Sequence, residues 1–359
     1  MPKIFREDVK KHKQYWNKQN KWIDKIMVLI NSDLNSHMAK AIAGFQMSRL
    51  VGQLQVGISM TGNKTEFISM GTTWIIVEAD KPKVEHETRI LWKTFEPAYN
   101  DIMKLRRQQE VDSNSEIRIY ENGGDLLKTN ATKCIGRDIE NAEKSKIWTP
   151  AIVSCRMESW LEAEDENILG IVNKAMDTYT TARLGNKQNV LGASVLLSIG
   201  IGKLQDKDMQ SNFKKKILDR RIAQSVFVYE GDKNISNYRQ SARVMGTSKE
   251  ALQAEISEQA RKIISRHAKN KAEFTISKEA VKVLTSYRDL SFRNRQVSQP
   301  ELLDKELGGR KTKVLKLAGI FAMWDMSVIV EVRHVFEAIA MVSRSTKGLS
   351  RYIEAGYGK

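Results

Sequence analysis

The sequence predicts an α/β protein in which helices cover a largely parallel β-sheet. Short apolar runs typical of buried strands alternate with stretches of helical periodicity through the middle of the chain. This strand signal ends near Glu230, whereas helical periodicity begins before the first strand and continues after the last one. We therefore expect a helical N-terminal arm over 1–36, an α/β body over 37–232 and an all-α C-terminal domain over 233–359.

The arm contains a regular apolar stripe. Apolar residues recur at steps of three and four over 10–30, which predicts one amphipathic helix with Trp16 and Trp22 on its apolar face. A basic stretch, Lys10–Lys13, includes the start of this helix. An exposed stripe of this kind suits docking onto another protomer or a partner protein, and burial on the chain's own body is the alternative.

The body is expected to begin with a helix over 37–51. Alternating residues over 53–60 and 65–70, with a Thr-Gly-Asn-Lys turn between them, predict a β-hairpin. The apolar run at 73–77 is typical of a buried strand, and a long helix should follow over 84–109. Further strands are expected at 117–120, 151–153, 195–201 and 225–229, with helices at about 122–140, 156–183 and 207–218 between them.

Four helices are expected after the body. The segment from Thr247 to Glu250 fits a capping box for a helix that runs to about His267. The other three are expected near 277–293, 310–324 and 331–353.

The charge balance points to a polyanionic partner. The chain has 59 Lys and Arg against 43 Asp and Glu, a net charge of +16, and nucleic acid is the usual partner of so basic a protein. Two cysteines exclude a disulfide framework, and with five histidines they form no recognisable zinc motif. A charged N-terminal segment and the lack of any apolar run near ~18 residues predict a cytoplasmic protein without membrane contact. We expect no metal and no cofactor.

No phosphate-binding loop is found where the predicted topology requires one. The best match, Gly57–Thr65, resembles G-x-x-x-x-G-K-T with one residue too many, and it lies between two predicted strands instead of opening a helix. The correct place follows the strand at 73–77. There, Glu78–Glu87 contains no glycine and several carboxylates, which would repel a nucleotide phosphate.

The order of these segments resembles the P-loop ATPase (helicase-like) region of phage and plasmid primase–helicase replication proteins. In this resemblance, 73–77 and the following helix match the Walker A strand and helix, 151–160 matches Walker B, and 196–200 matches the sensor strand. The likeness covers about 40–350 and includes 117–128, 217–227, 313–322 and 332–342. It implies a RecA/AAA+-like sheet and a replication protein of a phage or mobile element.

Both nucleotide motifs depart from this family. The family has a Gly-Lys-Ser/Thr loop, which is missing here, and two acids after the Walker B strand, where this chain has Cys155 and Arg156, with Glu158 displaced. Magnesium needs oxygen ligands and water activation needs a carboxylate. The resemblance therefore implies a catalytically degenerate relative that acts by assembly, and we lean against an enzyme. Two alternatives remain: a viral nucleoprotein that coats nucleic acid, and an active ATPase that uses the Gly57–Thr65 loop.

Clusters of basic residues are the candidate nucleic-acid contacts. Lysines and arginines neutralise backbone phosphates without reading sequence. The resemblance implies DNA in preference to RNA as the partner, and a homo-oligomer or a replication-protein partner. Tyr287 and Phe292 lie near the second cluster and could stack on bases. The candidates form one group after the sensor place and one in the C-terminal domain: Lys214, Lys215, Lys216, Arg220 and Arg221, then Arg293, Arg295, Arg310, Lys311 and Lys313.

Overall fold

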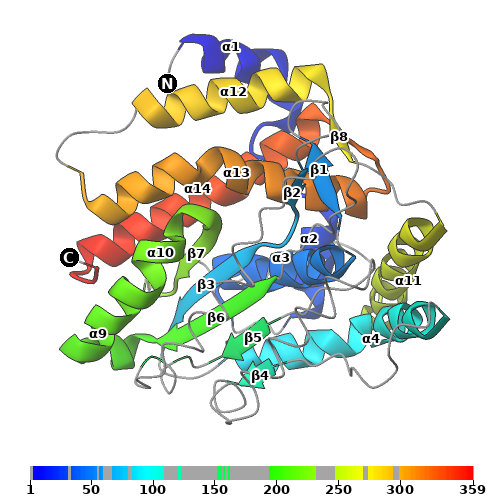
Figure 1. Ribbon diagram of the computed structural model, residues 1–359, viewed down its shortest axis with the longest axis horizontal. Helices are drawn as coiled ribbons and strands as arrows, with labels where there is room; N and C mark the ends of the chain where they lie inside the picture. The colour runs from blue at the N-terminus through cyan, green and yellow to red at the C-terminus, as the bar shows by residue number, and fades with distance from the viewer. Residues whose placement is uncertain are drawn as a thin grey trace.

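A parallel five-stranded sheet lies at the centre of the protein, and Figure 1 shows the computed structural model. The strand order is β4-β5-β6-β3-β7, and every neighbouring pair is parallel. The expected α/β class is therefore confirmed. The strands are β3 Thr73–Glu78, β4 Tyr120–Asn122, β5 Ile152–Cys155, β6 Val195–Gly200 and β7 Ser225–Tyr229. The structure describes residues 3–30, 34–54, 56–59, 67–79, 83–108, 120–122, 152–155, 157, 161, 194–231, 247–269, 274–293 and 299–358.

Strand β3 lies inside the sheet and is buried on both faces. It pairs with β6 on one side and β7 on the other, and all six of its residues are buried. Its side chains alternate between the two faces: Trp74 and Ile76 join the larger hydrophobic cluster, and Ile75 and Val77 join the smaller one. A continuous apolar run is what a strand buried on both faces needs.

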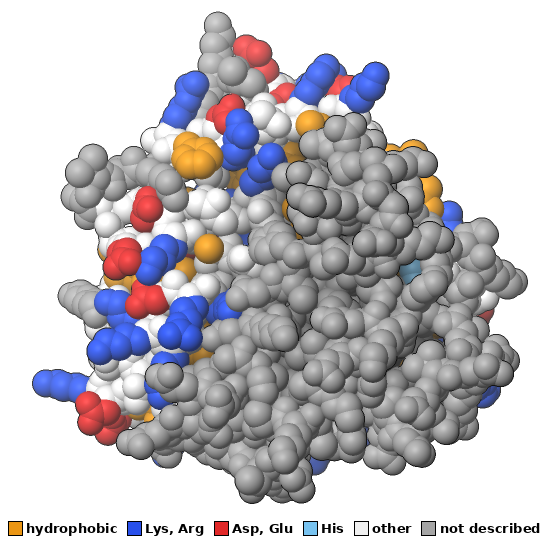
Figure 2. Space-filling view, in the orientation of Figure 1, with side chains coloured by type: hydrophobic (Ala, Val, Ile, Leu, Met, Phe, Trp, Pro, Cys, Tyr) orange, Lys and Arg blue, Asp and Glu red, His pale blue; other side chains and the backbone are white. Residues whose placement is uncertain are grey.

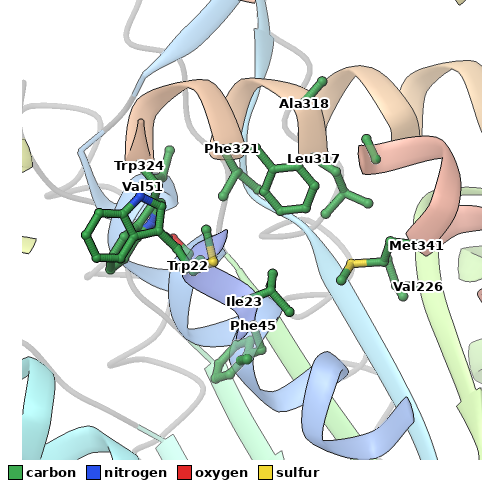
Figure 3. Packing of buried hydrophobic residues seen from close by; sticks show 14 of the residues in the cluster. Trp22, Ile23, Phe45, Val51, Val226, Leu317, Ala318, Phe321, Trp324 and Met341 are labelled. Carbon is green, nitrogen blue, oxygen red and sulfur yellow. Dashed lines mark hydrogen bonds between the residues drawn. The ribbon is translucent and has the colours of Figure 1, made fainter. Parts of the chain in front are cut away.

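Each face of the sheet has its own layer of helices. The larger cluster contains residues of α3 (Ser36–Gln53) and α4 (Val84–Gln108). Figure 3 shows Trp22 of α2 (Lys21–Leu29) and Trp324 of α13 (Glu301–Trp324) in the same cluster. The smaller cluster is covered by the segment between β6 and β7. That segment consists of the 3₁₀ turn η2 (Ile201–Gln205), α9 (Lys207–Phe213), the π-helical turn η3 (Lys214–Leu218), α10 (Asp219–Arg221) and the 3₁₀ turn η4 (Ile222–Gln224).

The C-terminal helices are where the sequence predicts them, although one is longer. They are α11 Lys249–Lys269, α12 Lys278–Arg293, α13 Glu301–Trp324 and α14 Val332–Glu354, with short parallel strands β8 Thr275–Ile276 and β9 Ile329–Val330. The α11 cap uses Ser248, whose Oγ accepts the Ala251 N–H at 3.1 Å. Helices α13 and α14 lie side by side along the sheet edge (Figure 1).

The expected hairpin is also present. Strands β1 (Gly57–Ser59) and β2 (Phe67–Ser69) pair in antiparallel fashion, with Ile58 opposite Ile68. The Gly57–Thr65 segment therefore begins in a hairpin strand, and the turn itself lies outside the described residues.

The prediction of a single helix over 10–30 is wrong. The arm forms α1 (Lys3–Lys11), the 3₁₀ turn η1 (Lys13–Tyr15) and α2 (Lys21–Leu29). Asn17 has a left-handed backbone, with φ of 58°, and Asn20 caps α2 by accepting the Trp22 N–H at 3.0 Å. Asparagine is common both in left-handed backbone and at helix N-caps, because its short polar side chain can hydrogen bond to nearby backbone groups.

The apolar stripe of the arm is buried on the chain's own body. Ile23 and Ile26 are fully buried, and the Phe5 ring lies 5.7 Å from that of Tyr287 in α12. One hydrophobic cluster includes residues of the arm, the sheet and the C-terminal helices. The arm therefore packs on the chain's own body, which was the alternative to docking on another protomer or a partner protein.

Several expected elements lie wholly or largely outside the described residues. They are the helices over 122–140 and 156–183 and the strand residues before Tyr120. None of the helices in the described ranges combines the length and apolarity that a bilayer span requires.

A glycine sets how closely α13 docks on the segment before β7. A Cβ on Gly309 would lie 1.6 Å from the carbonyl oxygen of Ala223 in η4. That oxygen is backbone and cannot rotate away. Any side chain at this position must therefore push α13 off the sheet edge.

We predict that Gly309→Ala destabilises the protein by about 1–3 kcal/mol or more, because overpacking displaces backbone. Gly319→Ala on the same helix is the control, since its Cβ would meet the flexible Met70 side chain at 3.0 Å. Urea unfolding of both variants measures the difference. Equal stabilities for the two variants would contradict the assigned close contact.

Candidate nucleic-acid interface

The place that corresponds to a phosphate loop holds a protein carboxylate. Glu78 ends β3, is 2 % exposed, and its Oε2 accepts the N–H groups of Lys83 at 2.9 Å and Val84 at 3.1 Å. These N–H groups lie at the start of α4, the position at which a helix N-terminus binds an anion. The chain therefore supplies its own anion where a phosphate would bind.

A second carboxylate occupies the same edge of the sheet. Glu230, directly after β7, accepts the Ala79 N–H through Oε2 at 2.8 Å. Burial raises the pKa of Glu78 and Glu230 raises it further, while hydrogen bonds from Val84, Lys83 and Ser198 oppose the rise. A nucleotide phosphate here would meet two acids and find the local backbone donors already used.

At the place that the resemblance matches to Walker B, the residues that the structure describes include no carboxylate for magnesium. Strand β5 ends at Cys155, and Arg156 and Glu158 lie outside the described residues. Within the described ranges, no group of three or more His, Cys, Asp or Glu side chains could hold a metal ion. The neighbouring strand β6 contributes Ser198, which hydrogen bonds to Glu78.

The first basic cluster is only partly available at the surface. Lys215 and Arg220 are exposed and Lys214 is half-buried, whereas Lys216 donates to the Leu161 carbonyl at 3.0 Å and Arg221 is 4 % exposed. The three lysines lie on the π-helical turn η3. Such turns are rare and often occur at functional sites.

Two members of the second cluster are interior residues, which corrects their assignment to a binding surface. Lys313 is fully buried and donates to Glu306 at 2.8 Å and to the Ile222 carbonyl at 3.3 Å. Arg310 is 9 % exposed and donates to Glu306 and to Thr346. Burial raises the pKa of Glu306, but Lys313 and Arg310 outweigh it and hold that pKa below its ordinary value.

The remaining members of the second cluster lie nearer the surface. Arg293 is exposed at the end of α12, Lys311 is half-buried on α13, and Arg295 lies outside the described residues. Burial lowers the pKa of Lys311, and the neighbouring Arg288 lowers it further. Tyr287 is 2 % exposed and packs against Phe5, so its ring has no face for a base. Phe292 is 51 % exposed.

The surface around the first cluster is mixed in charge. Figure 2 shows Lys and Arg side chains on the left of the view, where α9, α10 and α13 lie in Figure 1, with Asp and Glu between them. Lys203 and Lys207 of the same segment are exposed but were not among the predicted contacts. Each of these lysines is isolated in the sequence, so a search for runs of basic residues does not find it. Only their position in the connection between β6 and β7 could have identified them. We define Lys203, Lys207, Lys214, Lys215 and Arg220 as the β6–β7 basic surface.

No protein-family model matches the chain, and no curated protein shows significant similarity to it.

We predict that Lys313→Met destabilises the protein by about 3 kcal/mol or more, because it leaves the buried Glu306 carboxylate without its closest cation. The exposed Lys262→Met should change stability by less than ~0.5 kcal/mol. Urea unfolding separates the two. At a temperature where Lys313→Met is folded, its affinity for an oligonucleotide should equal that of the unmodified protein, and a lower affinity would return Lys313 to the binding surface.

Proposed function

We propose that this chain is a catalytically degenerate, helicase-like protein that binds nucleic acid through the β6–β7 basic surface and acts by assembly. The observation behind the proposal is the contact between Glu78 and the start of α4. The Glu78 carboxylate accepts the backbone N–H groups that a nucleotide phosphate would need in an α/β sheet of this kind. On the resemblance described above, the protein would belong to the replication machinery of a phage or mobile element.

The sheet order supports a RecA/AAA+-like arrangement. The strand of the Walker A place, β3, lies inside the sheet, and the strand of the sensor place, β6, lies directly beside it and parallel to it. The strand of the Walker B place, β5, is the next neighbour of β6. In open α/β sheets, ligands bind beyond the carboxyl ends of the strands, which is where Glu78 and Glu230 lie.

The same features weigh against the two alternatives. A viral nucleoprotein would favour a mostly helical fold with a central positive groove. Most of the described residues are helical, but a five-stranded parallel sheet lies at their centre. An ATPase using Gly57–Thr65 would need that loop to open a helix, and strands β1 and β2 flank it instead.

Nucleic-acid binding should be electrostatic and weakly selective. Replacing Lys214, Lys215 and Arg220 by Ala should weaken binding to all sequences alike and reduce the salt slope by about one to three units, because each phosphate contact contributes ~0.7–0.9 to it. Titrations of two dissimilar oligonucleotides of equal length at several salt concentrations measure both quantities.

The matched control removes three exposed lysines elsewhere: Lys104, Lys249 and Lys262 on α4 and α11, which Figure 1 shows on the opposite side of the sheet. The control variant should retain the full salt slope. Equal losses in both triple variants would assign binding to net charge alone, and an unchanged slope in the first would remove the β6–β7 basic surface from the interface.

ATP hydrolysis should stay at background with magnesium and DNA present, since Glu78 holds the donors that a phosphate would need. Phosphate release is the measurement. Turnover that disappears in Lys64→Ala would overturn the proposal and make the hairpin loop an active site.

A further inference from the structure

An aromatic side chain is exposed at the C-terminal end of α12. Phe292 is 51 % exposed, whereas Tyr287 of the same helix is 2 % exposed and packs against Phe5. Among the residues that the structure describes, the other large hydrophobic side chains left exposed are Ile90 and Ile329, and neither has a ring. Single exposed apolar side chains are common in proteins. What distinguishes Phe292 is therefore its ring and the side chains around it.

Basic side chains from two helices lie beside Phe292. Arg288 is half-buried one turn earlier on the same face of α12, Arg293 follows Phe292 directly and is exposed, and Lys311 on α13 is half-buried. Burial lowers the pKa of Lys311 and Arg288 lowers it further, so these two cations lie close together across the two helices. Figure 2 shows hydrophobic and basic side chains together on the left of the view, between α12 and α13 of Figure 1.

One carboxylate partly balances these cations. The Nη2 of Arg288 lies 2.9 Å from the Oδ1 of Asp289, and Asp289 also opposes the fall in the pKa of Lys311. With Arg293 included, three basic side chains and one acidic side chain lie around the ring. A basic surface with an exposed ring offers the two contacts that single-stranded nucleic acid makes with proteins, which are ion pairs to phosphates and stacking on bases.

Helix α13 connects this region with the β6–β7 basic surface. Lys305 of α13 forms an ion pair with Asp219 of α10 at 2.9 Å, and Lys311 lies fewer than two turns further along α13. Arg220 of the β6–β7 basic surface follows Asp219 in α10. Both regions lie on the left of the view in Figure 2. One extended strand can therefore contact both.

We propose that Phe292 is a stacking platform for a base of single-stranded nucleic acid, and that Arg288, Arg293 and Lys311 contact the phosphates beside that base. Every base has a π-face, so the contact is independent of sequence. In a duplex the bases are already stacked on one another, which leaves the ring without a partner. An acidic peptide would use the cations but would leave the ring without a flat group to stack on. The proposal rests on the proposed function for its class of partner, and it adds that the strand is single.

The test titrates the full chain with a thymidine oligonucleotide of about 16 residues at several salt concentrations. Phe292→Ala and Phe292→Leu should each weaken binding about 5- to 150-fold, which is the loss expected for one stacked base. The salt slope should not change, because the ring has no charge. Phe292→Trp should retain the affinity. Ile90→Ala is the matched control and should bind normally, since Ile90 is 41 % exposed and follows the exposed Arg89 but has no ring.

An abasic strand and a duplex of the same length separate stacking from other effects. Neither has a free base, so Phe292→Ala and Phe292→Leu should leave the affinity for both unchanged. Normal binding of the thymidine strand by the two variants would overturn the proposal. So would an equal loss in Ile90→Ala or an equal loss for the abasic strand. Thermal unfolding should show the Phe292 variants folded, because the side chain is half exposed.

The cations have a different signature. Replacing Arg293 and Lys311 by Gln should weaken the thymidine and abasic strands alike and lower the salt slope by about one to two units. An unchanged slope would remove both residues from the interface. Polyglutamate of equal charge should compete weakly and should bind Phe292→Leu as it binds the unmodified protein. Competition equal to that of the oligonucleotide, with the same loss in Phe292→Leu, would overturn the proposal in favour of an acidic peptide.

The stacking platform and the β6–β7 basic surface can fail separately. A loss of salt slope in the variant that replaces Lys214, Lys215 and Arg220, with normal binding by Phe292→Leu, would overturn the stacking platform alone. A loss of affinity in Phe292→Leu, with an unchanged slope in that triple variant, would overturn the β6–β7 basic surface alone. Failure of the unmodified protein to bind any oligonucleotide at low salt would overturn both.

Discussion

The buried carboxylate of Glu306 holds together the helices that close one edge of the sheet. It accepts hydrogen bonds from Lys313 at 2.8 Å, from Thr346 at 2.9 Å and from Arg310 at 3.2 Å. Lys313 also reaches the Ile222 carbonyl in η4. One carboxylate therefore connects α13, α14 and the segment that leads into β7. A buried ion group is stable only when each member keeps its partners, so these elements must pack together or not at all.

This packing decides what α14 presents along β7. Ser345, next to Thr346, accepts the Phe227 N–H through Oγ at 2.7 Å and so satisfies a donor on the free edge of the strand. Arg344 and Arg351 lie on the same stretch of helix and line a pocket beside that edge. The contacts that close the sheet thus also set how α14 lies against β7.

Carboxylates and basic side chains gather at different places around the sheet. Beyond β3, the carboxylates of Glu78 and Glu230 already occupy the backbone donors. On the β7 side of the sheet, burial and Arg344 lower the pKa of Lys40 to about 8. The backbone donors at the start of α4 are satisfied from within the chain.

Local periodicity was sufficient to predict β3, α3, α4 and α14, because burial on one or two faces leaves a direct pattern in neighbouring residues. It failed in the arm, where the spacing of apolar residues continued across a turn made by Asn17 and Asn20. Charge in the sequence indicated a polyanionic partner but not which cations face water. Arg310 and Lys313 are interior because Glu306 lies one helical turn before Arg310 and two turns before Lys313 on α13. Lys40 and Arg344 lie far apart in the sequence, and only the packing of α3 and α14 against β7 brings them into the lining of one pocket.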